Sequence, residues 1–492
     1  MWHAFADVRE LFIAIVSLTA CAFAHAGPMG YDDARHLLNR TGFGATDAEI
    51  RDYAALGREE AVDRLLAGAR REASIRPPAF VDEPFVPFYK VRQMGAEERQ
   101  AEQRKLMEQG FELRAWWLRE MSLTPSPLTE RMTLFWHNHF ATAQQKVRHG
   151  QLMYRQNALL RSEALGNFAT LLHAVAKDPA MLIYLDNAGS RRQAPNENFA
   201  REAMELFTLG EGHYSEHDVK EAARAFTGWS LDRDSGEFTY RRLWHDYGEK
   251  TVLGTTGRLD GDDVIDILLG RNETAEFIAA KVWREFVSPH PDAAEVRRWA
   301  AVFRASHYEI KPLVRAALAS EAFWTPGNRA ALIKSPIDLV VGTMRTFDIH
   351  PFDLRPAVYA CAALGQNPFS PPNVKGWPGG EAWITSATLL GRKQWLERVF
   401  RGSDPMLPSS GMREAQEKSE GADRFRRLLE RGMGDYAFDP GRFSRVTVAG
   451  NGAPGTLERL ALATPPVSAA GEERDLVERV RQLVADPAFQ LK

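Results

Sequence analysis

Apolar side chains recur along most of this 492-residue chain at the three- and four-residue spacing of amphipathic helices. Ser126 and Pro127 suit the N-cap and first turn of one helix, and Gly210 and Gly228 follow two others. The stretch from Phe238 to Gly254 contains β-rich pieces and predicts one short hairpin. We therefore predict an all-α fold, a large multi-helix assembly with at most a small β-hairpin insertion. The predicted helices cover residues 31–38, 47–56, 59–66, 96–121, 127–140, 150–162, 168–177, 197–209, 216–226, 262–269, 274–286, 293–305, 311–320, 336–347, 356–364, 386–400 and 472–485.

Changes in composition near residues 26 and 400 divide the chain into three predicted parts. Residues 1–26 form a signal peptide, because the apolar run Leu11–Ala22 precedes the small residues of Ala24-His25-Ala26. Residues 27–400 form one large helical domain. Residues 401–492 begin with Gly-, Ser- and Pro-rich breaks and form a C-terminal helical extension.

This N-terminus predicts export to the periplasm or the medium, with cleavage after Ala26. Two alternatives stay open. Leu18-Thr19-Ala20-Cys21 resembles a lipobox, which would make Cys21 a lipidated N-terminus, and the apolar run would also suit a buried helix. No later segment approaches the roughly 18 apolar residues of a membrane-spanning helix, so we expect no transmembrane segment in the mature chain.

The composition of the chain and the motifs that it lacks exclude several classes of function. The net charge of −3, with basic and acidic residues interleaved, argues against nucleic acid as a partner. Two cysteines, Cys21 and Cys361, exclude a Cys-rich zinc site or a disulfide framework. The chain has no Gly-Xaa-Ser-Xaa-Gly, His-Glu-Xaa-Xaa-His, Walker or Rossmann motif, which excludes the best-known hydrolase, zincin and nucleotide-binding classes.

Residues 195–210 contain the densest group of polar side chains. Helical geometry places Asn198, Arg201, Glu202 and Glu205 on one face. Two carboxylates three residues apart can share a divalent metal ion or divide acid and base roles, and Arg201 can pair with Glu205. The alternative is an ordinary solvated helix face.

The run Trp136-His137-Asn138-His139-Phe140 carries two histidines. Residues two apart on a helix point in different directions, so the two rings do not hold one ion. We expect His137 to join Glu202 and Glu205 as a metal ligand, or else to pack as a core histidine. Asn198, Glu202 and Glu205 are expected to face His137 or His245.

Two further segments are candidates for function. His245 and Asp246, in the stretch with β character, suit a base or ligand, or else a surface turn. Residues 366–383 form a loop rich in proline and glycine, in which Asn373, Lys375 and Trp377 suit a platform for a sugar or peptide. In the alternative, this loop packs its aromatic rings onto the helices.

Six strings taken together resemble the bacterial exported family known as domain of unknown function 1800 (DUF1800). They lie at residues 36–44, 136–140, 196–210, 223–229, 245–246 and 371–380. The resemblance implies export and a co-exported sulfatase-like partner, and it implies no activity or cofactor.

Two functions follow from these patterns. The first is an extracytoplasmic enzyme, with or without metal assistance, acting on a polymer or cell-surface substrate. Glu202, Glu205, His137 and His245 would be its ligands or proton carriers. The second is a non-catalytic binding or assembly protein that works with the co-exported partner. A desolvated carboxylate in a pocket favours the enzyme, and an exposed apolar patch favours the binding protein.

Overall fold

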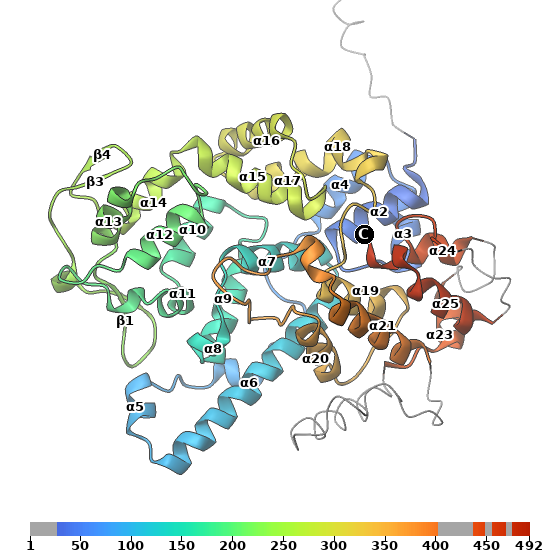
Figure 1. Ribbon diagram of the computed structural model, residues 1–492, viewed down its shortest axis with the longest axis horizontal. Helices are drawn as coiled ribbons and strands as arrows, with labels where there is room; N and C mark the ends of the chain where they lie inside the picture. Colours follow the sequence, from blue (N-terminus) through green and yellow to red (C-terminus); the bar gives the residue numbers. More distant parts are fainter. Residues whose placement is uncertain (1–26, 402–435, 448–454, 469–474) are drawn as a thin grey trace, which may run out of the picture.

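The computed structural model of the protein describes residues 27–401, 436–447, 455–468 and 475–492 (Figure 1). The predicted signal peptide and the alternative lipidation site at Cys21 lie outside these residues. Helices make up most of the described chain and the strands are few and short, which confirms the all-α prediction. None of the described helices is long and apolar enough to cross a membrane.

The first of two apolar cores is built by helices from the middle of the chain. Trp136, Phe168 and Phe226 are fully buried in it. The helices that contribute to it are α4 (Arg58–Ala67), α7 (Pro127–His139), α9 (Gly150–Ser162), α10 (Phe168–Ala176), α11 (Pro179–Tyr184), α12 (Glu197–Glu205), α13 (Glu216–Ala225), α14 (Gly261–Leu269), α15 (Asn272–Phe286), α16 (Ala293–Ala305), α17 (Ile310–Ala319) and α18 (Glu321–Trp324).

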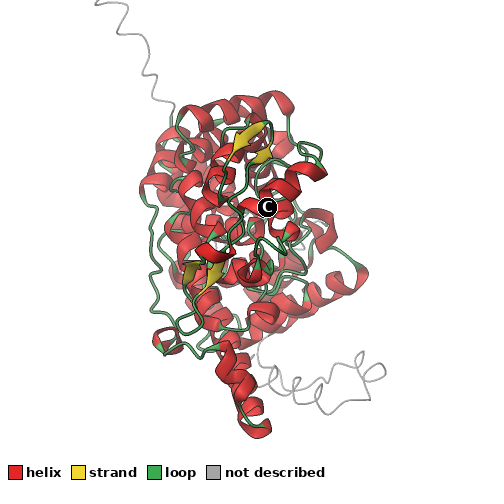
Figure 2. Cartoon of the chain, turned by 90° about the vertical axis from the view of Figure 1, so that its left-hand side faces the viewer, coloured by secondary structure: helices red, strands yellow, loops and turns green. Residues whose placement is uncertain are grey.

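Two small hairpins lie at the edge of this core, where one was predicted (Figure 2). Strands β1 (Trp229–Leu231) and β2 (Phe238–Tyr240) pair antiparallel, and so do β3 (Lys250–Val252) and β4 (Thr255–Gly257). The predicted hairpin joined β2 to β3, which instead have different partners. Three-residue strands are too short to show an alternating pattern, which explains the error.

The second core combines the long α6 with helices from the C-terminal part of the chain. Residues 436–492 contribute Tyr436, Phe443 and Phe489 to the same core as α19 to α21. The members are α3 (Asp47–Ala54), α6 (Ala96–Leu123), α8 (Gln144–Val147), α19 (Pro336–Thr346), α20 (Arg355–Ala363), α21 (Ser386–Phe400), α23 (Pro440–Val446), α24 (Thr456–Ala461) and α25 (Leu476–Ala485).

Helix α7 lies between the two cores and is fixed to both. Its Glu130 accepts hydrogen bonds from Arg161 of α9 at 2.5 and 2.9 Å, and from the indole nitrogen of Trp117 of α6 at 2.8 Å. Its Arg131 pairs with Asp338 of α19. Buried charges of this kind are tolerated only when they are paired, so these contacts hold α7 in one position.

Helix α5 (Phe88–Gln93) and the N-terminal half of α6 form an arm that projects from the body of the molecule (Figures 1 and 2). Most residues from 96 to 108 are exposed, whereas most residues from Leu113 to Met121 in the C-terminal half of α6 are buried or partly buried. Helix α2 (Gly30–Thr41) contacts both cores. The short 3-10 turns are η1 (Ala79–Asp82), η2 (Asn187–Gly189), η3 (Arg242–Trp244), η4 (Pro326–Asn328), η5 (Gly380–Trp383) and η8 (Pro487–Gln490).

Candidate functional site

A pocket of about 680 Å³ lies where α7, α15, the start of α19 and the loop of residues 366–383 meet. We call it the Lys281 pocket. Two of the strings that carry the family resemblance line it, with Asn138 and His139 from the first and Lys375 to Gly380 from the second. Its charged residues are Arg131, Lys281, Arg284, Glu285, Asp338, Lys375, Glu381 and Lys492, with His290 at the edge.

Lys281 of α15 contacts a histidine instead of an acid. Its amino group lies 2.9 Å from Nδ1 of His139, and Nε2 of His139 lies 3.2 Å from the carbonyl oxygen of Phe207. A carbonyl only accepts, so Nε2 carries the proton and Nδ1 accepts from Lys281. Burial, with Lys281 in support, keeps the pKa of His139 well below its usual range, so this histidine is neutral.

The same burial lowers the pKa of Lys281 to about 8, and the positive charge of Arg284 adds to the effect. No ion pair of Lys281 or Arg284 with an acid occurs within the described residues. A lysine that titrates near neutral pH in a pocket can bind an anion when charged and accept a proton when neutral.

Two further donors at this pocket have no hydrogen-bond partner in the part of the chain that the structure describes. They are Nε of Arg131 and the indole nitrogen of Trp377. Both side chains are buried, and an unpaired buried donor is costly. Both atoms are enclosed by the surrounding protein, so they are not donors to a ligand in the pocket as it stands.

The opposite charges of the pocket are bound to one another. Asp338 pairs with Arg131 and with the amino group of Lys492 at 2.7 Å, and Arg131 also reaches Glu285 at 3.4 Å. These cations hold the pKa of Asp338 far below its usual range against the effect of burial. Asp338 and Glu285 therefore neutralise Arg131 and Lys492. Lys281, Arg284 and the exposed Glu381 are the lining charges that have no ion pair within the described residues.

Asn138 of α7 fixes the wall formed by the 366–383 loop. Its Oδ1 accepts a hydrogen bond from the backbone of Trp377 at 2.7 Å. A Cβ atom on Gly376 would lie 2.2 Å from that oxygen, and the φ of Gly376 is +82°. Only glycine fits this position, which gives a structural reason for the Lys-Gly-Trp-Pro-Gly-Gly sequence.

Lys375 connects the Lys281 pocket to the predicted acidic cluster. Its amino group lies 3.8 Å from Glu205 and 3.5 Å from Glu211. Glu205 also accepts a hydrogen bond from Tyr214. Burial first, and then Glu205, raise the pKa of the half-buried Glu202, while Lys375 and Arg201 oppose the rise. The structure thus brings Lys375 beside the acidic pair on α12.

Other members of the predicted cluster lie differently. Arg201 pairs with Glu216 at 2.7 Å and not with Glu205, because Glu216 at the start of α13 offers a bidentate partner. Asn198 is exposed, so the expectation that it faces inward is wrong. Asn373 accepts from the backbone of Lys375 at 2.9 Å, which shapes the loop.

The two histidines of α7 have different surroundings. His137 is buried among Trp117, Phe369 and Trp377, and its Nε2 has no partner in the described chain. Burial lowers its pKa to about 3. Trp377 is only 4% exposed, so it packs on His137 and forms no open stacking platform.

No three His, Cys, Asp or Glu side chains of the described residues are arranged to hold a metal ion, and this includes His137, Glu202 and Glu205. His245 is buried, and its Nδ1 donates to the carbonyl of Thr227 at 2.8 Å. Asp246 pairs with Arg224 at 2.8 Å. Among the described contacts of these two residues none involves α12, so they stabilise the hairpin region.

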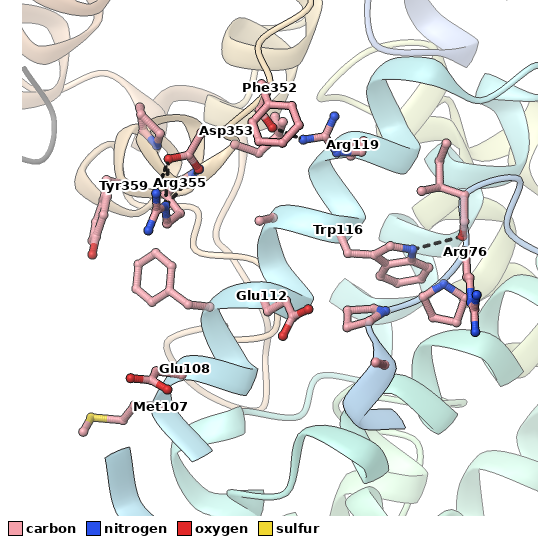
Figure 3. Close-up of a pocket in the computed structure, with 18 residues that line it drawn as sticks. Arg76, Met107, Glu108, Glu112, Trp116, Arg119, Phe352, Asp353, Arg355 and Tyr359 are labelled. Carbon is pink, nitrogen blue, oxygen red and sulfur yellow. Dashed lines mark hydrogen bonds and ion pairs between the residues drawn. The ribbon is translucent and has the colours of Figure 1, made fainter. Parts of the chain in front are cut away.

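A larger cavity of about 1290 Å³ lies between α6, residues 75–79 and the start of α20 (Figure 3). Some of its polar groups bond to one another: Arg355 pairs with Asp353, and the indole of Trp116 donates to the carbonyl of Ile75 at 3.1 Å. No predicted site residue lines it, and we therefore place the candidate site in the Lys281 pocket.

The fold and this pocket define a large helical protein with a donor-rich, cationic pocket held between two apolar cores. Residues 36–491 match the family described as "Protein of unknown function (DUF1800)", so the chain belongs to that family. Neither the search of curated proteins nor the search of solved structures found a match.

Sequence patterns did not reveal Lys281, Arg284 or Arg131. The only signal for Lys281 is a lysine within the apolar stretch Phe277 to Trp283, on a helix with no unusual motif. Its partner His139 is 142 residues away in sequence, so the contact depends on tertiary packing.

Proposed function

We propose that this protein is an exported enzyme that binds an acidic group of an extracytoplasmic polymer or cell-surface substrate in the Lys281 pocket. The ligand group is a carboxylate, sulfate or phosphate. The observation that carries the proposal is the position of Lys281, which faces the pocket without an acidic partner and donates to a neutral histidine. Arg284, a second lining cation with no acidic partner among the described residues, supports the same class of ligand.

Lys281 is also the proposed acid–base group. A pKa of about 8 leaves it mostly charged at neutral pH, with a usable fraction in the neutral form. His139 accepts a hydrogen bond from the amino group in either state, so it orients Lys281. Glu202, whose pKa is raised, is a second proton carrier, connected to the pocket through Glu205 and Lys375.

Sulfate and phosphate ions are suitable probes because the substrate is unknown. We expect isothermal titration at pH 6.5 and constant ionic strength to show sulfate binding to the mature chain. Lys281→Met should weaken it roughly tenfold or more, since a buried charged hydrogen bond is lost. Lys311→Met, which removes an exposed charge on α17, is the control and should bind like the wild type. If Lys281→Met binds sulfate as tightly as Lys311→Met does, the proposed site is wrong.

A non-catalytic role beside a co-exported sulfatase-like protein is the second candidate function. It is favoured by a basic, partly apolar groove along the projecting arm, which is separate from the Lys281 pocket. The two candidates concern different places on the molecule, because one needs a site for a small acidic group and the other needs a protein-binding surface.

A further inference from the structure

A groove of about 1280 Å³ follows the projecting arm between α5, α6 and α8. We call it the basic groove. Its charged lining is unbalanced, with Glu102 as the only acid. The cations are Arg92, Arg99, Arg114, Lys146 and Arg148, with His149 beside them.

Few of these cations are neutralised by acids. Lys146 pairs with Asp186 at 2.6 Å. Arg99 donates to the carbonyl of Met94 at 3.0 Å, and Arg114 donates to the carbonyl of Pro368 and the hydroxyl of Ser370, both at 3.1 Å. No ion pair of Arg92 or Arg148 occurs within the described residues. Four of the five cations therefore have no acidic partner among the described residues, and three of these four, Arg92, Arg99 and Arg148, are exposed to solvent.

Apolar side chains and the three glutamines Gln103, Gln144 and Gln145 form the rest of the lining. Val91, Leu106, Met107 and Phe111 lie between the basic residues, and Met107 is 64% exposed. Methionine adapts its shape to varied partners. Exposed apolar surface bordered by charge is typical of a protein-binding site. Met107 also lines the cavity drawn in Figure 3.

We propose that the basic groove binds an acidic amphipathic segment of a partner protein. The carboxylates of the segment would pair with the arginines, and its apolar side chains would cover Leu106, Met107 and Phe111. The positive charge of the groove favours an acidic partner. Its apolar lining favours a peptide with apolar side chains over a polyanion that carries charge alone. This proposal is independent of the one for the Lys281 pocket.

The test is fluorescence anisotropy with a labelled synthetic peptide of about 15 residues, long enough for four helical turns. The peptide carries Glu on one face and Leu and Phe on the other. We expect saturable binding to the mature chain, weakened roughly tenfold or more by Arg92→Glu/Arg148→Glu and also by Met107→Asp. The matched control Arg297→Glu/Lys311→Glu reverses two exposed charges on α16 and α17 and should bind like the wild type.

Poly-glutamate and a sulfated polysaccharide serve as competitors that offer charge alone. The proposal requires that they compete at least roughly tenfold less well than the unlabelled peptide. Equal competition, equal binding by all variants, or loss of binding in the control would overturn it. Circular dichroism of each variant shows whether a loss of binding comes from loss of the fold.

Discussion

The amino group of Lys281 donates to Nδ1 of His139 across 2.9 Å, and the other nitrogen of that ring donates to the carbonyl of Phe207. The contact joins α15 to α7 and to the chain that follows α12. Because His139 is neutral, it does not compensate the charge of Lys281. An anion entering the pocket would therefore meet a charged donor that is already oriented.

Gly376→Ala should destabilise the fold strongly. The new Cβ would meet Oδ1 and the carbonyl oxygen of Asn138 at 2.2 and 2.5 Å, at a φ of +82°. We expect the free energy of unfolding to fall by about 2–5 kcal/mol, from backbone strain and overpacking together. Urea denaturation measures this change.

Gly379→Ala is the matched control, because Gly379 has a φ of +70° but no atom within 4 Å of the added Cβ. It should cost only the backbone term of about 1–3 kcal/mol, because its ψ of −178° places it in a region that side chains rarely adopt. Equal losses in the two variants would show that the contact with Asn138 is unimportant.

Asp178 predicts a pH dependence of stability. Burial raises its pKa to about 7, although the carboxylate caps α11 and accepts from Gln156 at 2.7 Å. The pKa of Asp178 is higher in the folded state than in the unfolded state. The stabilisation that its protonated side chain contributes is therefore fully present below about pH 4 and is lost as the pH rises through about 7.

Asp178→Asn keeps the acceptor oxygen without the charge. At pH 8 it should be more stable than the wild type by on the order of 2–4 kcal/mol, and at pH 4 the two should be similar. Asp292→Asn, which changes an exposed cap of α16, should shift stability by less than about 0.5 kcal/mol at both pH values. A wild type as stable as Asp178→Asn at pH 8 would refute the assignment.

Asp338→Asn should destabilise the protein by about 3–5 kcal/mol, because it leaves Arg131 and Lys492 buried without their partner. The pKa of Asp338 is lowered in the fold, so the stabilisation from its carboxylate is fully present above the unfolded-state pKa of about 4. It is lost progressively as the pH falls from there through the lower folded-state pKa. The difference between wild type and variant should therefore shrink in acid. Asp63→Asn, which breaks the exposed pair with Arg315, should cost no more than about 1 kcal/mol.

In a bacterial host the mature chain should begin at Gly27 and fractionate outside the cytoplasm. The apolar run and Ala24-His25-Ala26 motivate this prediction. Intact mass or N-terminal sequencing decides it. An acylated Cys21 would support the lipobox alternative, and an intact Met1 would contradict both.

The helical fold could be predicted from the sequence because the apolar period and the caps of long helices are local signals. Helix α13 begins at Glu216, as the period and the Ser215 cap indicate. The pairs of three-residue strands could not be predicted, because such short segments carry no period.

The site was predicted only in part. The sequence singled out Glu205, Lys375 and the loop around Trp377, and the structure places Lys375 beside Glu205 and against the Lys281 pocket. It could not reveal Lys281, since a single lysine on an apolar helix gives no sign of a partner 142 residues away. The sequence suggested that Arg201 pairs with Glu205 of the same helix. In the structure it pairs with Glu216 of α13, which accepts hydrogen bonds through both carboxylate oxygens.

Lys281 is, in our proposal, the titrating cation of a binding pocket for acidic groups. The most direct test is sulfate affinity from pH 6 to about 9.5, measured by calorimetry for the wild type and for Lys281→Arg. Arginine stays charged throughout this range. The account predicts that wild-type affinity falls as the pH rises through about 8, while that of Lys281→Arg stays nearly constant. The same pH profile in both proteins, or no measurable sulfate binding by the wild type at pH 6, would contradict it.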